Sequence, residues 1–283
     1  MQTIRSLRQP GPIHPSRVDV FRGDVELLHF TLTPGATLNE AITAPLVKAG
    51  FQCGTVTFGA VAVDPFRYVI PALPDDDSHV AYFSTPRAPV GISRIEHANA
   101  TFGWAVGKPF THCHATWIEP DGNRRGGHIL PLETIVVGAA EATAWGFRTI
   151  RIDAKPDLET NFTLFQPSGP TSASGRGLVI RVKPNEDILT ALETIARTHG
   201  IRDAVVRGSL GSLIGAHFIH GCQVQDHATE VLVRQGHIRD SKAALDLIVV
   251  DMSGRLHEGW LRRGENPVCI TFELVLEDIT AAT

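Results

Sequence analysis

The chain has 283 residues, of which 43% are hydrophobic, and a formal net charge of −4. This length allows one large domain or two of ordinary size, and the hydrophobic content is sufficient for a buried core. Neither half carries a run of lysine and arginine, which argues against a protein whose affinity comes from neutralising phosphates.

The N-terminal segment, residues 1–18, is predicted to be an extended arm, because it contains Pro10, Pro12 and Pro15. It lacks the apolar stretch of a secretory signal, and no apolar run of the chain approaches 18 residues. The four cysteines, at positions 53, 113, 222 and 269, have no C-x-x-C spacing. We therefore expect a cytoplasmic protein with reduced thiols and no membrane partner.

Residues 19–165 are predicted to form a first domain. A β-like run ends at Pro34, a polar region suited to a helix N-cap follows, and apolar residues then recur at helical spacing until Gly50. Further β-like runs, such as 54–58 and 91–106, are separated by turn residues and are compatible with antiparallel pairing.

Three histidines of this domain fall on a predicted β-hairpin. Side chains alternate along Phe110–Ile118, so His112 and His114 share one face, and Asp121-Gly122 marks the turn. If residue 128 pairs opposite residue 114 or 116, His128 joins that face. Three imidazoles with an open fourth position are typical of a catalytic zinc site. The alternative is that these are polar residues of a half-exposed strand, or buried histidines bonded to the backbone.

The chemistry expected of such a site requires Zn²⁺ or another divalent transition metal, which activates water and polarises an oxygen of the substrate. Arg124 and Arg125, in the predicted turn, are candidates for holding the carboxylate of a small anionic substrate. Glu133, Glu96 and His97 are candidates for a general base or for a partner that orients a ligand histidine. His97 could also be a fourth ligand, which would close the site.

A second copy of the domain pattern follows a linker. The linker, residues 166–177, is rich in Pro, Gly and Ser, and the second domain is predicted over 178–283. Its stretch 180–188 matches 30–38 at an offset of 150, and its apolar residues then recur at helical spacing. One helix packed on an antiparallel sheet in each copy predicts the α+β class.

The second copy cannot build the same histidine site. Further along the chain the offset falls to 132, because the first copy holds an extra Pro-rich loop. This offset places Ala244, Asp246 and Trp260 where the first copy has its three histidines. One interpretation is that the first copy carries the chemistry and the second supplies scaffold, an interface or a pocket wall. The other is that neither copy carries chemistry.

The histidine hairpin resembles the PPC (plant and prokaryote conserved) domain, in which a G-G-H-L type element follows an H-x-H strand. The residues that carry this resemblance are Lys108-Pro-Phe-Thr-His-Cys-His114, Asp121-Gly122 and Gly126-Gly-His-Ile-Leu130. In the second copy Gly259-Trp-Leu261 stands in for Gly-His-Leu. The chain is thus identified as a tandem PPC-domain protein. The resemblance implies α+β domains with antiparallel sheets and a homo-oligomer, with a trimer preferred.

Two functions follow from these observations. Plant members of the family associate with DNA through a separate AT-hook, but the nearest fragment here, Ser174-Gly-Arg-Gly177, lacks its flanking basic residues and its proline. Specific DNA binding is therefore not expected. The predicted function is a metal-dependent hydrolase or lyase that acts on a small organic acid, ester or lactone. The alternative is a non-enzymatic PPC-domain protein that binds DNA or a regulatory partner.

Overall fold

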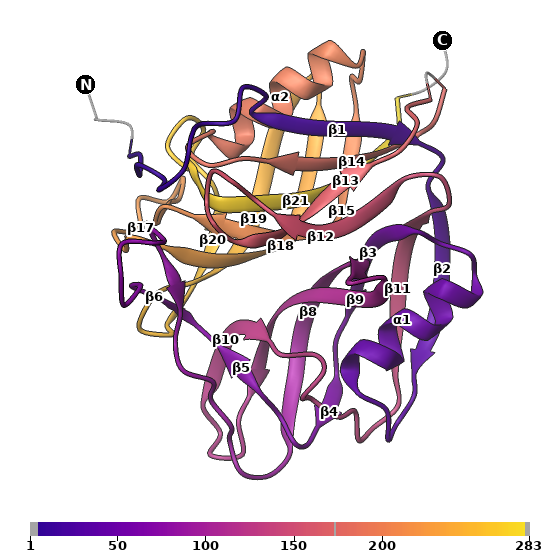
Figure 1. Cartoon of the computed structure of the whole chain (residues 1–283), viewed down its shortest axis with the longest axis vertical. Coiled ribbons are helices and arrows are strands. Elements are labelled where there is room, and N and C mark those ends of the chain that lie inside the picture. The colour runs from indigo at the N-terminus through magenta and orange to yellow at the C-terminus, as the bar shows by residue number, and fades with distance from the viewer. Residues whose placement is uncertain (1–4, 173, 281–283) are drawn as a thin grey trace.

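Two antiparallel sheets, each with one helix of 11 residues, make up the computed structural model, which describes residues 5–172 and 174–280 (Figure 1). By content the molecule is mostly β. Each sheet packs one face on its own helix and turns the other toward the second sheet. This confirms the prediction of two units that each combine an antiparallel sheet with one helix.

The first unit is a ten-stranded sheet in which β2-β11-β3-β8-β9-β10-β5 form the main path, with β4 and the β12–β13 hairpin attached at β8. Its strands are β2 Glu26–Leu32, β3 Cys53–Phe58, β4 Val61–Val63, β5 Tyr68–Val69, β8 Ser93–Ala105, β9 Lys108–Ile118, β10 Arg124–Ile129, β11 Ala140–Phe147, β12 Arg151–Pro156 and β13 Thr163–Ser168. Helix α1, Leu38–Lys48, covers its outer face, and β6 Pro71–Ala72 pairs with β7 Tyr82–Phe83 in a separate hairpin.

The second unit is a seven-stranded sheet of order β1-β14-β21-β15-β18-β19-β20. Its strands are β1 Val18–Gly23, β14 Gly177–Val182, β15 Ala204–Leu213, β18 Thr229–Arg239, β19 Lys242–Val250, β20 Leu256–Trp260 and β21 Val268–Asp278. Helix α2, Ile188–Thr198, covers the outer face, and β16 Ala216–His217 pairs with β17 Gln223–Val224.

The two helices begin and end at equivalent positions, as the offset of 150 predicts. Thr37 caps α1 in a reciprocal capping box with Glu40, and the Asp187 side chain caps α2. Both helices are followed by a glycine with positive φ, Gly50 at 81° and Gly200 at 66°, a conformation that side chains with a Cβ rarely adopt.

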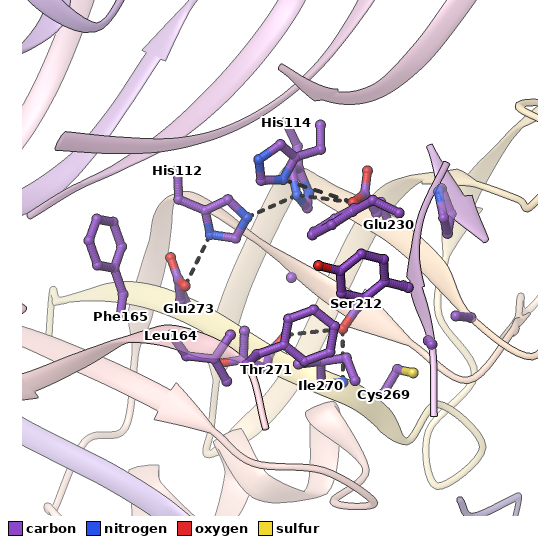
Figure 2. A pocket seen from close by; sticks show the side chains of 18 of the residues that line it. His112, His114, Leu164, Phe165, Ser212, Glu230, Cys269, Ile270, Thr271 and Glu273 are labelled. Atoms are coloured by element: carbon purple, nitrogen blue, oxygen red, sulfur yellow. Dashed lines mark hydrogen bonds and ion pairs between the residues drawn. The ribbon is translucent and has the colours of Figure 1, made fainter. Parts of the chain in front are cut away.

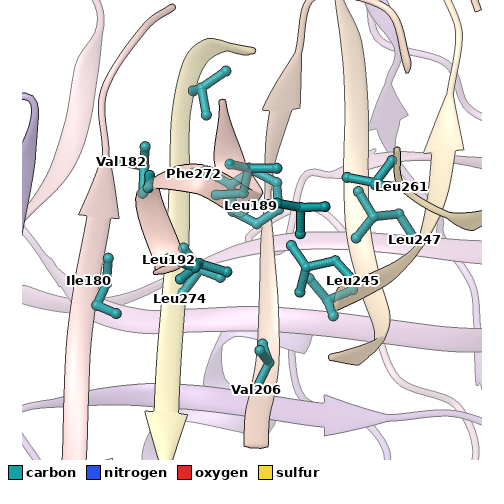
Figure 3. Close-up of a cluster of buried hydrophobic side chains, with 14 of the residues drawn as sticks. Ile180, Val182, Leu189, Leu192, Val206, Leu245, Leu247, Leu261, Phe272 and Leu274 are labelled. Atoms are coloured by element: carbon teal, nitrogen blue, oxygen red, sulfur yellow. The ribbon is translucent and has the colours of Figure 1, made fainter. Parts of the chain in front are cut away.

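The apolar face predicted for the second helix forms the core of its unit. Leu189 and Leu192 of α2 pack over Ile180, Phe272 and Leu274 of the sheet (Figure 3). Full burial of a leucine side chain stabilises a fold by about 1.5–3 kcal/mol, so this face supplies much of what holds helix to sheet.

The N-terminal part of the chain crosses from one unit to the other. Residues 1–4 of the predicted arm lie outside the described residues, and residues 18–23 form β1, which pairs with β14 of the second unit (Figure 1). The first domain was predicted to start at residue 19. In the structure the strand at residues 18–23 belongs to the second unit, and the first unit begins at β2. The cause is long-range pairing, since a strand pattern does not indicate which sheet receives the strand.

The predicted linker is shorter than expected. Strand β13 runs to Ser168 and β14 begins at Gly177, so the first three residues of 166–177 belong to a strand of the first unit.

The two units are joined by polar contacts between buried side chains and backbone. The Asn99 amide on β8 donates to the carbonyls of Ser209, at 2.9 Å, and Val233, at 2.7 Å. Thr55 on β3 donates to the carbonyl of Arg207 at 2.9 Å. A shift of one sheet over the other would break these hydrogen bonds, and a buried polar group that loses its partner costs about 1–3 kcal/mol. The bonds therefore favour one relative position of the two sheets.

Over the described ranges, no helix is both long and apolar enough to span a bilayer. The four cysteines are free thiols, and Cys113 is buried between its sheet and α1, facing away from the histidines on the same strand as predicted. Burial raises the pKa of this thiol far above its ordinary value.

Candidate metal centre

The hairpin that carries the histidines has the predicted register. Strand β9 turns at residues 119–123 and returns as β10, so that His128 lies directly opposite His114. Beyond β10, His128 also pairs with Val69 of β5. Gly127 makes this close pairing feasible, because a Cβ at that position would lie 2.5 Å from the carbonyl oxygen of Val69.

Ring nitrogens of His112, His114 and His128 converge within 4.8 Å of one another. The Nε2 atoms of His112 and His114 are 3.1 Å apart. On its other side, His114 Nδ1 lies 2.9 Å from the carbonyl oxygen of Val231, which accepts only, so this nitrogen carries the hydrogen. His112 Nδ1 likewise donates to the carboxylate of Glu273 at 3.1 Å. With both rings neutral, the two Nε2 atoms therefore direct lone pairs at each other, and a hydrogen or a metal ion must lie between them.

These nitrogens fit a metal ion. Two lone pairs repel at 3.1 Å, whereas bonds of 2.0–2.1 Å in a tetrahedral zinc site place ligand nitrogens about 3.3 Å apart. The third nitrogen, Nδ1 of His128, is buried and has no hydrogen-bond partner in the described structure. Hydrogen bonds from the outer N–H groups of His112 and His114 are the usual way in which ligand histidines are oriented.

Burial also sets the protonation state of two rings. It lowers the pKa of His114 and of His128 well below the ordinary value, and the neighbouring His112 acts in the same direction. Neutral imidazole is the form that binds metals, so these two rings are ready for a metal at neutral pH.

Two carboxylates of the second unit complete the site, and neither was predicted from the sequence. Glu273 lies on β21 and bonds His112, while Oε1 of Glu230 on β18 lies 3.9 Å from both His114 Nε2 and His128 Nδ1 (Figure 2). The second oxygen, Oε2, of each carboxylate is buried without a partner. Burial raises the pKa of Glu230 well above its ordinary value.

A sequence signal for these carboxylates did exist. On β21 the residues Phe272 and Leu274 face α2, so Glu273 between them faces the first unit. Glu230 precedes Val231, which also faces α2, in the same way. A carboxylate inside an apolar strand is costly unless it has a partner, and that cost points to a site.

The histidines open into a cavity between the two units with a volume of about 190 Å³ (Figure 2). Strands β9, β10 and β13 of the first unit and β15, β18 and β21 of the second contribute to its wall. The interpretation in which the second copy supplies a pocket wall thus agrees with the structure.

The other residues predicted for the site lie outside this cavity. Glu96 and Glu133 are exposed, and His97 pairs with Thr116 rather than joining the three converging histidines. Arg124 forms ion pairs with Glu96 and Glu258 at 2.6 Å, and Arg125 lies 3.7 Å from Glu119. Proximity along the hairpin suggested these residues, but Arg124 and Arg125 lie three or four residues from His128, about 10–13 Å along a strand.

The position equivalent to the histidine site in the second unit holds an ion pair instead. Asp246 pairs with Trp260 across β19 and β20 as His114 pairs with His128, which confirms the alignment at offset 132. The carboxylate of Asp246 accepts two hydrogen bonds of 2.9 Å from Arg234. In the described part of the chain, the three histidines of the first unit are the group suited to a metal.

Comparison with known proteins yields one family. The family model described as the Plants and Prokaryotes Conserved (PCC) domain matches residues 169–280, the unit that lacks the three histidines. No curated protein matches the chain.

Several solved structures are similar in part. A plant- and prokaryote-conserved (PPC) protein of Pyrococcus horikoshii is 17% identical, with a TM-score of 0.40, over 52% of this chain and 94% of its own. A metal-containing protein of Archaeoglobus fulgidus is 17% identical, with a TM-score of 0.40, and the match covers 59% of this chain and 99% of that protein. A protein of Bacteroides thetaiotaomicron, named as a candidate DNA-binding protein, is 13% identical, with a TM-score of 0.38, over 53% and 98%.

Proposed function

We propose that this chain, whose residues 169–280 match the PCC domain, is a metal-dependent hydrolase or lyase that acts on a small organic acid, ester or lactone. His112, His114 and His128 would hold the metal, zinc or another divalent transition ion. A metal bound there supplies a Lewis acid that polarises a carbonyl oxygen and lowers the pKa of water.

One observation carries this proposal. The Nε2 atoms of His112 and His114 lie 3.1 Å apart, while the outer nitrogens are held by Glu273 and the Val231 carbonyl. With both rings neutral, these contacts leave no hydrogen for the space between the rings, and a metal ion is what two facing lone pairs accept. The adjoining cavity of about 190 Å³ gives a substrate access to that space.

The two carboxylates, Glu273 and Glu230, have different roles in the proposed hydrolysis. Glu273 orients the His112 ring through its 3.1 Å bond to Nδ1. In the reaction the oxygen of water bonds to the carbonyl carbon, and the bond from that carbon to the ester oxygen breaks. Burial alone favours the protonated form of Glu230, but a divalent cation held by the histidines, two of whose nitrogens lie 3.9 Å from Oε1, would favour its carboxylate. In that form Glu230, with its free Oε2, would accept the proton of this water and pass it to the leaving oxygen.

The proposal is tested by metal removal. Metal content is measured first, and small carboxylates, esters and lactones are then screened for turnover before and after chelation. We expect turnover that is lost with the metal and returns with added zinc. Turnover that survives complete metal removal, or none with the metal-loaded protein on any of these classes, would contradict the proposal.

We also propose that copies of the chain form a homo-oligomer, with a trimer preferred. The support is the family resemblance of the histidine hairpin together with the two PCC-like units that already pack sheet to sheet within one chain. Sedimentation at micromolar concentration is expected to give three times the mass of one chain, and a stable monomer would count against it.

Duplex DNA is expected to bind weakly and without sequence preference at physiological salt. The net charge of −4 offers phosphates little attraction, and arginines such as Arg124 and Arg234 are already paired with carboxylates. Fluorescence anisotropy with labelled duplexes in about 0.15 M salt checks this. Nanomolar, sequence-selective binding would favour the non-enzymatic alternative instead.

A further inference from the structure

The walls of the cavity are mostly aromatic and aliphatic. The large aromatic and aliphatic side chains that line it come from both units and are Tyr82, Phe83, Phe110, Phe162, Leu164, Phe165 and Ile270. Figure 2 labels three of them, Leu164, Phe165 and Ile270. The ring of Phe83 lies 5.1 Å from that of His128 and 6.2 Å from that of Phe162, centre to centre. Phe83 thus connects the histidine end of the cavity with its apolar body.

Three hydroxyl groups along the wall are already engaged by the protein, whereas those of Tyr82 and Thr163 belong to exposed residues at its solvent side. Ser212 accepts from the Ile270 amide at 2.9 Å, Thr229 donates to the Leu213 carbonyl at 3.1 Å, and Thr271 accepts from Arg181 at 3.3 Å. These three hydroxyl groups therefore offer a ligand little further hydrogen bonding in the buried part of the cavity.

The buried polar atoms without partners lie at one end. Among the lining residues that the structure describes, these atoms are His128 Nδ1, Glu230 Oε2 and Glu273 Oε2. All three belong to the histidine site. A ligand that matches this cavity therefore carries its polar group at one end and an apolar body at the other.

The charged residues of the cavity wall further restrict which ligands can bind. No arginine or lysine occurs among the described residues that line the cavity, whereas two carboxylates do. Ionised beside a divalent ion held by the three histidines, these carboxylates would offset the charge of that ion. A substrate with further carboxylates would meet Glu230 and Glu273 without a cation to pair with, and burying an unpaired charge is costly.

We propose that the cavity takes an uncharged ester or lactone with an aromatic or similarly apolar body, its carbonyl oxygen at the histidine end. The volume of the cavity is suitable for an aromatic ring, because an apolar cavity of about 150 Å³ holds benzene and this one measures about 190 Å³. The inference rests on the proposed function for the reaction, but binding can be measured separately. It departs from the small anionic substrate that the sequence suggested, because Arg124 and Arg125 lie elsewhere.

Binding is tested with probes that the protein cannot hydrolyse. Acetophenone, an uncharged aromatic ketone, and succinate, a dianion, are titrated into the full-length zinc-loaded protein and followed by ligand-observed NMR. The Phe162→Ala variant is expected to weaken acetophenone binding at least about tenfold, because it removes an aromatic contact together with buried area. Leu158→Ala, at a residue 78% exposed outside the cavity, serves as the control and is expected to bind as the parent does.

The outcomes separate this inference from the proposed function. Acetophenone binding that exceeds succinate binding, and that falls in Phe162→Ala alone, supports the inference. Succinate binding as tight as acetophenone binding, or acetophenone binding unchanged in Phe162→Ala, overturns it. If acetophenone binds as expected but phenyl acetate is not hydrolysed faster than in buffer, the binding inference stands and hydrolysis is wrong.

Discussion

Replacing His114 with alanine is expected to abolish metal binding and metal-dependent turnover while the chain remains folded. A site of three imidazoles that loses one loses both affinity and its hold on the reacting oxygen. The variant also removes the donor to the Val231 carbonyl, which costs about 1–3 kcal/mol, so we expect a lower melting temperature with unchanged circular dichroism. Metal per chain and turnover are measured beside the parent.

Trp260→His is the matched control for this variant, because residue 260 occupies the equivalent position in the second unit. The new histidine would have two potential ligands nearby, Asp246, which is paired with Arg234, and His237, whose ring lies 5.7 Å from that of Trp260, while Ala244 offers none. Metal content is expected to equal that of the parent. Full turnover by metal-free His114→Ala would show that the chemistry lies elsewhere.

Replacing Glu230 with glutamine is expected to lower kcat by about 10²–10⁴-fold, the usual contribution of a group that transfers protons. Glutamine has nearly the same shape, so the cavity and the three histidines are preserved. Because Glu230 Oε1 lies 3.9 Å from two ligand nitrogens, metal content in the variant is the second measurement, and we expect one metal per chain, as in the parent.

Glu258→Gln is the control for this substitution. Glu258 belongs to the same unit as Glu230 but pairs with Arg124 and Arg234 outside the cavity, so turnover is expected to stay within about twofold of the parent. Turnover by Glu230→Gln equal to that of the parent would contradict the proton-transfer role. Loss of metal from that variant would instead make Glu230 a ligand, which also contradicts it.

Features with local or repeated patterns could be predicted from the sequence. The offset of 150 placed both helices, because capping residues and apolar spacing repeat in each copy. The three histidines were found because alternation on a strand and the turn at Asp121-Gly122 determine which side chains share a face.

Features that depend on packing between distant segments could not be predicted. The pattern of β21 indicates that Glu273 lies on the face away from α2, but not that this face covers His112. For the same reason β1 was assigned to the unit that follows it in sequence rather than to the one it joins. Glu96, Glu133 and His97 were chosen as neighbours along the hairpin, whereas the carboxylates that reach the histidines come from the opposite sheet.

The central claim, that three histidines of the first unit hold one metal, is tested most directly by crystals of the metal-loaded protein with anomalous diffraction at the absorption edge of the metal. We expect one peak per chain, about 2.0–2.1 Å from a ring nitrogen of each of His112, His114 and His128. Full occupancy by zinc at another place, or no peak between these rings after loading with zinc, would contradict the account.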